Sequence, residues 1–416
     1  MRRTSAESPE VFAARRRRLA EEVGRGVIAL LGYGDDEGAS GFTGFRQESN
    51  FYYLTGHAES GAALLIAPRN GNASYREILF LPSDKRRRSL WTGSRLGPRD
   101  AGATGFDEVS EAPSLPRELR SLIKGRKPLF GLRSPSVDRS AGGMSVLMER
   151  LREAAGRTDI RDVRAVLASM RSIKSANEMA LLQKAVTATE AAYRAAWTAV
   201  TPGAAERSVI AEFVGAAFKA GCDRLAFPPM AGAGANAAIL HYSRNRSVMR
   251  EGELLLMDAG GEYMRYAADI ARTVPVGGKF DDHQRRLYEA VLGAQRAAMA
   301  AACPGAKLNG SESNSLQSVA ERALRKLAPS GVDTHLPHAL GHHVGLDVHD
   351  PSPPGGRLKK GMVVTVEPGL YLPDQGIGIR IEDMIEITED GSRLMSGGLP
   401  RGANQVEGAL SAAREA

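Results

Sequence analysis

Histidine is unevenly distributed in this sequence. The chain has eight histidines, and five of them fall between positions 335 and 349: His335, His338, His342, His343 and His349. Gly341 and Gly345 interrupt this stretch, and glycine allows the backbone to approach another group closely. A single histidine is usually a structural residue, but a cluster of this kind favours a site with imidazole ligands or acid–base groups.

Carboxylates lie at the ends of apolar strands in the same half of the chain. Asp258 ends the predicted strand 253–258, just before a glycine turn. Asp269 lies in what reads as the neighbouring strand, and an antiparallel pair can bring the two acids side by side. Glu367 ends the apolar segment 362–367. A surface cap is a poor explanation for Glu367, because the strand before it is apolar throughout.

The segment 376–387 reads as one strand with two different faces. The two-residue period of a strand places Ile377, Ile379 and Ile381 on one face. The other face then carries Gly378, Arg380 and Glu382. An exposed strand with a surface ion pair would show the same pattern, so this segment indicates a site only together with the others.

Four carboxylates and one histidine of the cluster combine into a predicted two-metal site; the carboxylates are Asp258, Asp269, Glu367 and Glu382. Four carboxylates in one place repel one another, and cations relieve that repulsion. We therefore expect two divalent cations a few Å apart, joined by a bridging carboxylate. Oxygen donors with a single imidazole favour manganese, with Co²⁺ or Zn²⁺ as alternatives.

The predicted helices and strands that position these residues fall into two parts, with a boundary near residue 170. A length of 416 residues with 43% hydrophobic residues predicts two domains. Residues 1–170 alternate strands with helices, which is typical of an α/β layer. Residues 171–416 predict an α+β arrangement with helices on one face of a largely antiparallel sheet. The helices expected in this second part cover residues 177–200, 206–220, 283–302 and 313–327.

Charge and cysteine usage limit the partners that we expect. The chain has 55 basic and 48 acidic residues, and the whole excess of +7 falls in residues 1–170. We interpret the basic runs 15–18 and 85–88 as solvated surface, because no aromatic stacking pattern accompanies them. No apolar run approaches the roughly 20 residues that span a bilayer. Two cysteines form no disulfide framework, so we expect a cytoplasmic protein. The basic runs and the short apolar runs together predict neither a nucleic-acid nor a membrane partner.

The motifs around these residues resemble creatinase-like, or pita-bread, metallopeptidases, specifically the aminopeptidase P and prolidase group. Seven segments match in order and spacing: 240–242, 258–260, 269–273, 338–342, 347–350, 365–369 and 378–383. Segments 46–56 and 90–95 match as well. The resemblance implies an α/β N-terminal accessory domain, residues 1–170, and an α+β pita-bread catalytic domain, residues 171–416.

The resemblance also implies roles for individual residues. Asp258 would bind one metal, Asp269 and Glu382 would bridge both, and His342 and Glu367 would complete the second. His241, His338 and His349 would contact the substrate or the developing oxyanion. Glu367 would also shuttle a proton, and Arg380 would support the metal ligands. The pattern gives His335 and His343 no role.

The implied activity is hydrolysis of the N-terminal Xaa–Pro bond of peptides, by a homodimer or homotetramer. A prolidase restricted to Xaa–Pro dipeptides is the alternative. An amidinohydrolase or a metal-free binding protein of the same fold agrees less well with the sequence, because those members lack the full ligand set that is present here.

Overall fold

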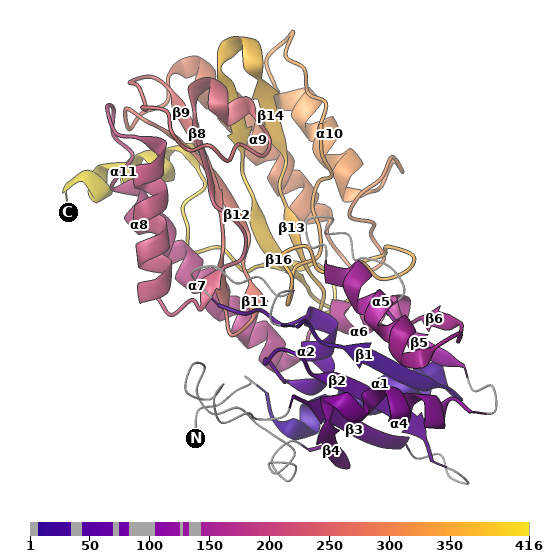
Figure 1. Cartoon of the computed structure of the whole chain (residues 1–416). Coiled ribbons are helices and arrows are strands. Elements are labelled where there is room, and N and C mark those ends of the chain that lie inside the picture. Colours follow the sequence, from indigo (N-terminus) through magenta and orange to yellow (C-terminus); the bar gives the residue numbers. More distant parts are fainter. Residues whose placement is uncertain are drawn as a thin grey trace. The chain divides into compact units, whose positions relative to one another are not determined.

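The computed structural model describes residues 7–34, 44–69, 75–82, 105–124, 128–132 and 143–415, without the side chains of 143–145. The chain forms two compact units, Met1–Arg171 and Ser172–Ala416 (Figure 1). The basic run 85–88 and the motif 90–95 lie outside the described residues.

The first unit is an α/β layer around a six-stranded sheet with the order β4-β3-β2-β1-β5-β6. Its strands are β1 (Val27–Leu31), β2 (Ala63–Pro68), β3 (Tyr75–Leu81), β4 (Glu108–Glu111), β5 (Leu129–Gly131) and β6 (Ile160–Asp162). Its helices are α1 (Pro9–Val23), α2 (Ser49–Thr55), α4 (Leu115–Leu122), α5 (Gly143–Ala155) and α6 (Arg164–Ser172). The β1–β2 and β2–β3 pairs are antiparallel and the other pairs are parallel.

The prediction that the basic run 15–18 is solvated surface is wrong for its first two residues. Arg15 and Arg16 are buried, because they lie on the face of α1 that also buries Phe12 and Leu19. The Arg16 guanidinium lies 2.7 Å from Glu77 Oε2 and donates to the carbonyl of Leu54 at 3.0 Å. This guanidinium therefore holds the first unit together and is not available to a partner.

The second unit contains short antiparallel sheets and long helices. Its strands are β7 (Arg224–Leu225), β8 (Met230–Ala233), β9 (Leu254–Ala259), β10 (Gly261–Tyr263), β11 (Tyr266–Ala267), β12 (Ile270–Pro275), β13 (Val363–Val366), β14 (Gly369–Leu372), β15 (Ile377–Arg380), β16 (Asp383–Ile387) and β17 (Ser392–Leu394). They form the sheets β11-β10-β7, β12-β9-β8, β13-β16-β17 and β14-β15, in which every pair is antiparallel.

The helices of the second unit confirm the expected α+β arrangement. They are α7 (Ala176–Trp197), α8 (Glu206–Lys219), α9 (Asp282–Ala301), α10 (Leu316–Leu327) and α11 (Ala403–Glu415). The α7 and α8 helices pack together, as do α9 and α10 (Figure 1). Capping boxes at Ser175/Glu178 and Asp281/Gln284 fix where α7 and α9 begin, because each satisfies two backbone amides that a helix leaves unpaired. Within the described part of the chain, none of the helices is both long and apolar enough to cross a membrane.

The prediction of a single strand over 376–387 is wrong. The segment forms β15, which pairs with β14, and β16, which pairs with β13 and β17. Ile381 and Glu382 lie between them, where the chain passes from one sheet to another. Asp269 likewise lies between β11 and β12 and not inside a strand. Two proposed ligands therefore occupy strand junctions, where the change of partner directs the side chain away from the regular ladder.

A buried polar network joins the strands behind these junctions. The Arg272 guanidinium lies 2.7 Å from Asp383 Oδ1, and neither side chain is exposed. Arg272 Nη1 also donates to the carbonyl of Glu382 at 2.6 Å. The Gln295 amide on α9 donates to Asp383 Oδ2 at 3.0 Å and to the carbonyls of Val366 and Ile381 at 3.1 and 2.9 Å. This network fixes the ends of the strands that carry the candidate ligands.

We predict that Arg272→Met lowers the free energy of unfolding of the metal-free protein by about 3 kcal/mol, because it leaves the buried Asp383 carboxylate with only the longer 3.6 Å contact to Arg401. Arg393→Met is the matched control: Arg393 pairs with Glu386 at the surface, at 2.6 Å, and its loss should cost less than about 1 kcal/mol. Urea unfolding followed by circular dichroism measures both variants. Equal losses would contradict this account of the network.

Candidate active site

The strand register brings the acidic residues together. In the antiparallel pair of β9 and β12, Ala271 lies opposite Asp258, so Asp258 and the residues just before β12 are neighbours. The Glu382 amide donates to the carbonyl of Ala271 at 3.0 Å and places Glu382 on the other side of β12. Asp258, Asp269 and Glu382 therefore come from three adjacent backbone segments.

Glu367 and His342 extend this array. Val366 lies opposite Asp383 in the pair of β13 and β16, so Glu367 follows β13 where Glu382 precedes β16. The segment with His342 runs beside β13, because the amide of Thr365 donates to the carbonyl of His342 at 2.9 Å. This approach requires glycine at position 341, since a Cβ there would lie 2.1 Å from the carbonyl oxygen of Thr365.

Three sets of side chains each place their potential ligand atoms within 4.8 Å of one another: Asp258, Asp269 and Glu382; His342, Glu367 and Glu382; and Asp269, His342 and His349. The structure thus brings together all five residues predicted as metal ligands. Glu382 belongs to the first two sets, and Asp269 to the first and third. This arrangement suits two cations that share carboxylates.

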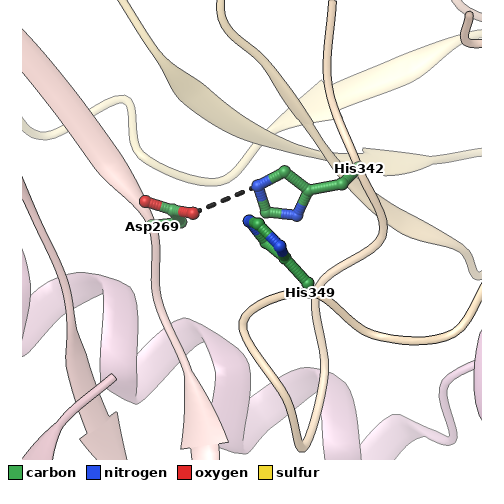
Figure 2. Close-up of side chains that lie close together, drawn as sticks. All are labelled: Asp269, His342 and His349. Atoms are coloured by element: carbon green, nitrogen blue, oxygen red, sulfur yellow. Dashed lines mark ion pairs between the residues drawn. The ribbon is translucent and has the colours of Figure 1, made fainter. Parts of the chain in front are cut away.

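The His342 imidazole points one nitrogen into this cluster and uses the other to hold its orientation. Figure 2 shows the ring facing the Asp269 carboxylate, with His349 beside it. Its Nε2 lies 3.2 Å from Asp269 Oδ2 and 3.5 Å from Glu367 Oε1. Its Nδ1 donates to the carbonyl of His343 at 3.1 Å. A bond of this kind fixes the ring and leaves Nε2 to bind a metal.

Proton affinities in the cluster are far from their ordinary values. Burial raises the pKa of Asp258 to about 7; the charge of Asp269 adds to this rise, and Arg380 opposes it. Burial and the neighbouring carboxylates, Asp269 first, also raise the pKa of Glu382 well above its usual range. Burial alone would lower the pKa of His342, but the hydrogen bond and charge of Asp269, with the charge of Glu367, raise it to about 9. Arg380 and His342 therefore offset only part of the mutual repulsion of the carboxylates.

The hydrogen bonds of Asp258 show whether the cluster of carboxylates suits cations. Asp258 Oδ2 accepts from Arg380 Nη1 at 2.5 Å, whereas its buried Oδ1 has no hydrogen-bond partner among the described residues. A buried carboxylate oxygen without a partner is costly. A divalent cation beside Oδ1 would satisfy it and would offset the repulsion between the acids. The residues present therefore fit a pair of hard divalent cations.

Arg380, Tyr371 and His338 form a chain of hydrogen bonds beside the cluster. Arg380 Nε donates to Tyr371 Oη at 2.8 Å, so the tyrosine hydroxyl donates onward to His338 Nε2 at 2.9 Å. His338 Nδ1 donates to the carbonyl of Ala339 at 2.8 Å. Burial and the charge of Arg380 lower the pKa of His338 to about 4, and burial raises the pKa of Tyr371 to about 12. His338 is therefore a neutral imidazole at neutral pH.

The remaining predicted residues lie at the edge of the site or outside it. His241 is exposed and follows Leu240, whose carbonyl accepts from Arg380 Nη2 at 3.3 Å beside the cluster. His349 is exposed and belongs to the third donor set. His335 is exposed and belongs to none of the three sets, and His343 is buried with its pKa lowered to about 4, mainly by burial. The catalytic roles suggested for His241, His338 and His349 stay predictions.

Two residues of the site escaped the sequence analysis. Thr365 Oγ1 donates to Glu367 Oε1 at 3.1 Å and accepts from the amide of His342 at 3.0 Å. Thr365 lies two residues before Glu367, so the strand period places both on one face and could have revealed it. Tyr371 carries no such signal, because its partners Arg380 and His338 lie nine and thirty-three positions away in the sequence.

Comparisons with known proteins show which families the chain resembles. The model of metallopeptidase family M24 matches residues 180–389, and that of the aminopeptidase P N-terminal domain matches 12–130. The Xaa-Pro aminopeptidase of Escherichia coli K12 is 32% identical, over 98% of this chain and 99% of its own. The structure of E. coli aminopeptidase P with the inhibitor Pro-Leu has a TM-score of 0.84, at 30% identity over 99% of this chain and 100% of that one. A zinc-substituted form of that enzyme with product has a TM-score of 0.83, at 30% identity over 98% and 99% of the two chains.

We predict that Mn²⁺ binding at pH 7 releases protons and that its apparent affinity rises with pH from 7 to 9. The pKa of His342 is raised to about 9, so this ring is protonated at pH 7 and must lose its proton before Nε2 can bind a cation. Titration calorimetry in buffers of different ionisation enthalpy counts the protons released.

The matched variants for that experiment are His342→Gln and His335→Ala. The first should release about one proton fewer, and the second, on the same segment but outside the cluster, should release as many as the unchanged protein. Binding heats that do not depend on the buffer would contradict the protonation states described above.

Proposed function

The chain belongs to metallopeptidase family M24, and we propose that it removes the first residue from peptides whose second residue is proline. It is a metallo-aminopeptidase with an aminopeptidase P N-terminal domain and an M24 catalytic domain of the pita-bread fold. The observation that carries the proposal is the five-ligand cluster of four carboxylates and His342, held at adjacent strand ends. The similarity to Xaa-Pro aminopeptidases along nearly the whole chain supports the same substrate class.

Proline defines the chemical problem at this site. The nitrogen of an Xaa–Pro bond carries no hydrogen, so an enzyme cannot recognise it as a donor. When bound, divalent cations acidify a water and polarise the scissile carbonyl. Glu367 is suited to accept a proton and pass it to the proline nitrogen, because burial raises the pKa of its carboxyl. The hydrogen bond from Thr365 holds one oxygen of Glu367 in place for this transfer.

The histidines around the cluster have separate roles in this proposal. Asp258, Asp269, His342, Glu367 and Glu382 hold the cations. The neutral His338 lies with Nδ1 3.9 Å from Glu367 Oε2, and together with His241 and His349 it contacts the substrate or the developing oxyanion. Arg380 keeps Asp258 oriented through its 2.5 Å contact.

Three finer points belong to the same proposal. The family uses divalent metal ions, and the oxygen-rich donor set supports manganese, with cobalt or zinc as substitutes. Two unpaired cysteines, Cys222 and Cys303, support a cytoplasmic location. Assembly as a homodimer or homotetramer follows from the resemblance to this family.

We predict that a tripeptide Xaa-Pro-Yaa is cleaved after its first residue and that the same tripeptide with alanine in place of proline is cleaved poorly. Protein treated with a chelator should be inactive and should recover activity with Mn²⁺. Product analysis by mass spectrometry, on chelated and reloaded protein, makes the comparison. Cleavage of Xaa–Pro dipeptides alone would identify a prolidase instead.

We also predict that Asp269→Asn and Glu382→Gln each lower kcat by more than about a hundredfold, since even the outer partners of metal ligands can cost that much. His335→Ala serves as the control, because this exposed histidine lies outside the cluster, and it should retain the activity of the unchanged protein. Near-normal turnover by either ligand variant after metal loading would exclude the assigned cluster as the active centre.

A further inference from the structure

Glu206 is a buried carboxylate that the proposed reaction does not use. It is the first residue of α8, and its side chain is entirely buried. Oε1 accepts from the amide of Ala233 at 2.9 Å and from Asn236 Nδ2 at 2.8 Å. Oε2 accepts from Tyr242 Oη and from the amide of Ser247, both at 2.9 Å. All four donors are neutral and come from one segment, 233–247.

The charge of Glu206 is stabilised without a cation. The four hydrogen bonds satisfy both oxygens, and the N-terminal end of α8 favours a negative charge there. The backbone repeats the connection, because the amide of Glu206 donates to the carbonyl of Ser247 at 3.0 Å. Glu206 therefore ties the two ends of the segment to the start of a long helix.

This segment carries His241 between two attachment points. On one side, the carbonyl of Leu240 accepts from Arg380 Nη2 at 3.3 Å, and Arg380 binds the candidate ligand Asp258. On the other side, Tyr242 is buried and its hydroxyl binds Glu206. His241 itself is exposed. Its backbone is thus held from both sides, while its side chain remains accessible to a substrate.

We propose that Glu206 is a positioning residue that fixes His241 at the edge of the active site and thereby sets how well peptides bind there. The inference rests on the proposed function, because it assigns His241 to the peptide substrate. Glu206 acts through the segment 233–247 and touches neither the metal ligands nor the scissile bond. Loss of its two-oxygen acceptor should therefore impair substrate binding and leave metal affinity intact.

The test is a double-mutant cycle with Glu206→Gln and His241→Ala. An amide has one acceptor oxygen, so Glu206→Gln removes the acceptor for one of the two pairs of donors. We expect kcat/KM for Xaa-Pro-Yaa to fall about tenfold or more, chiefly through KM, because small displacements of a binding group are costly. In the His241→Ala background the same change should have little further effect. Calorimetry should find the Mn²⁺ affinity of all three variants unchanged.

Glu212→Gln is the matched control, because Glu212 is exposed on the same helix, and it should leave kcat and KM unchanged. Independent, multiplicative losses in the cycle, or a reduced Mn²⁺ affinity, would overturn the inference and leave Glu206 with a structural role alone. If Glu206→Gln does not fold, Tyr242→Phe removes only one of the four donors and enters the same cycle. If the protein with its own sequence fails to cleave Xaa-Pro peptides, the proposed function is refuted instead. The failure of the proposed function and the failure of this inference can therefore be told apart.

Discussion

The rest of the catalytic unit depends on the confinement of four carboxylates, Asp258, Asp269, Glu367 and Glu382, in one largely buried place. Like charges at this separation raise one another's proton affinity, and burial raises it further. Raised proton affinities and the charge of Arg380 offset part of this repulsion, but Asp258 Oδ1 has no hydrogen-bond partner among the described residues. Only a fold that resists this repulsion can keep the acids close enough to share cations.

Part of this resistance comes from groups that bind the backbone beside the proposed ligands. Gln295 holds the carbonyls of Val366 and Ile381, each of which directly precedes a ligand. The hydroxyl of Tyr193 lies 3.1 Å from the carbonyl of Met257, just before Asp258, and also contacts the carbonyl of Ile270, just after Asp269. Because these side chains bind carbonyls, the ligand oxygens remain open to cations. These hydrogen bonds fix the backbone beside the proposed ligands and do not use their carboxylate oxygens.

Local sequence signals drew attention to the proposed ligands, which the structure brings together, but not to the groups that support them. A carboxylate at the end of an apolar strand or a histidine in a glycine-rich segment is visible within a few residues. The division of 376–387 into two strands was not, because it depends on which distant strands pair with each half. Arg16 was misjudged for a similar reason: its partner Glu77 is sixty-one positions away in the sequence. Glu206, Gln295 and Tyr371 act through contacts of the same long-range kind, which no short motif records.

The site also shows how one segment supplies two histidines of opposite character. His338 and His342 are four residues apart, yet burial and Arg380 lower the pKa of the first to about 4, while Asp269 and Glu367 raise that of the second to about 9. The difference follows from the neighbour that each ring faces. Burial disfavours the charged form of both rings, and only at His342 do the hydrogen bond and charge of Asp269, with the charge of Glu367, outweigh it.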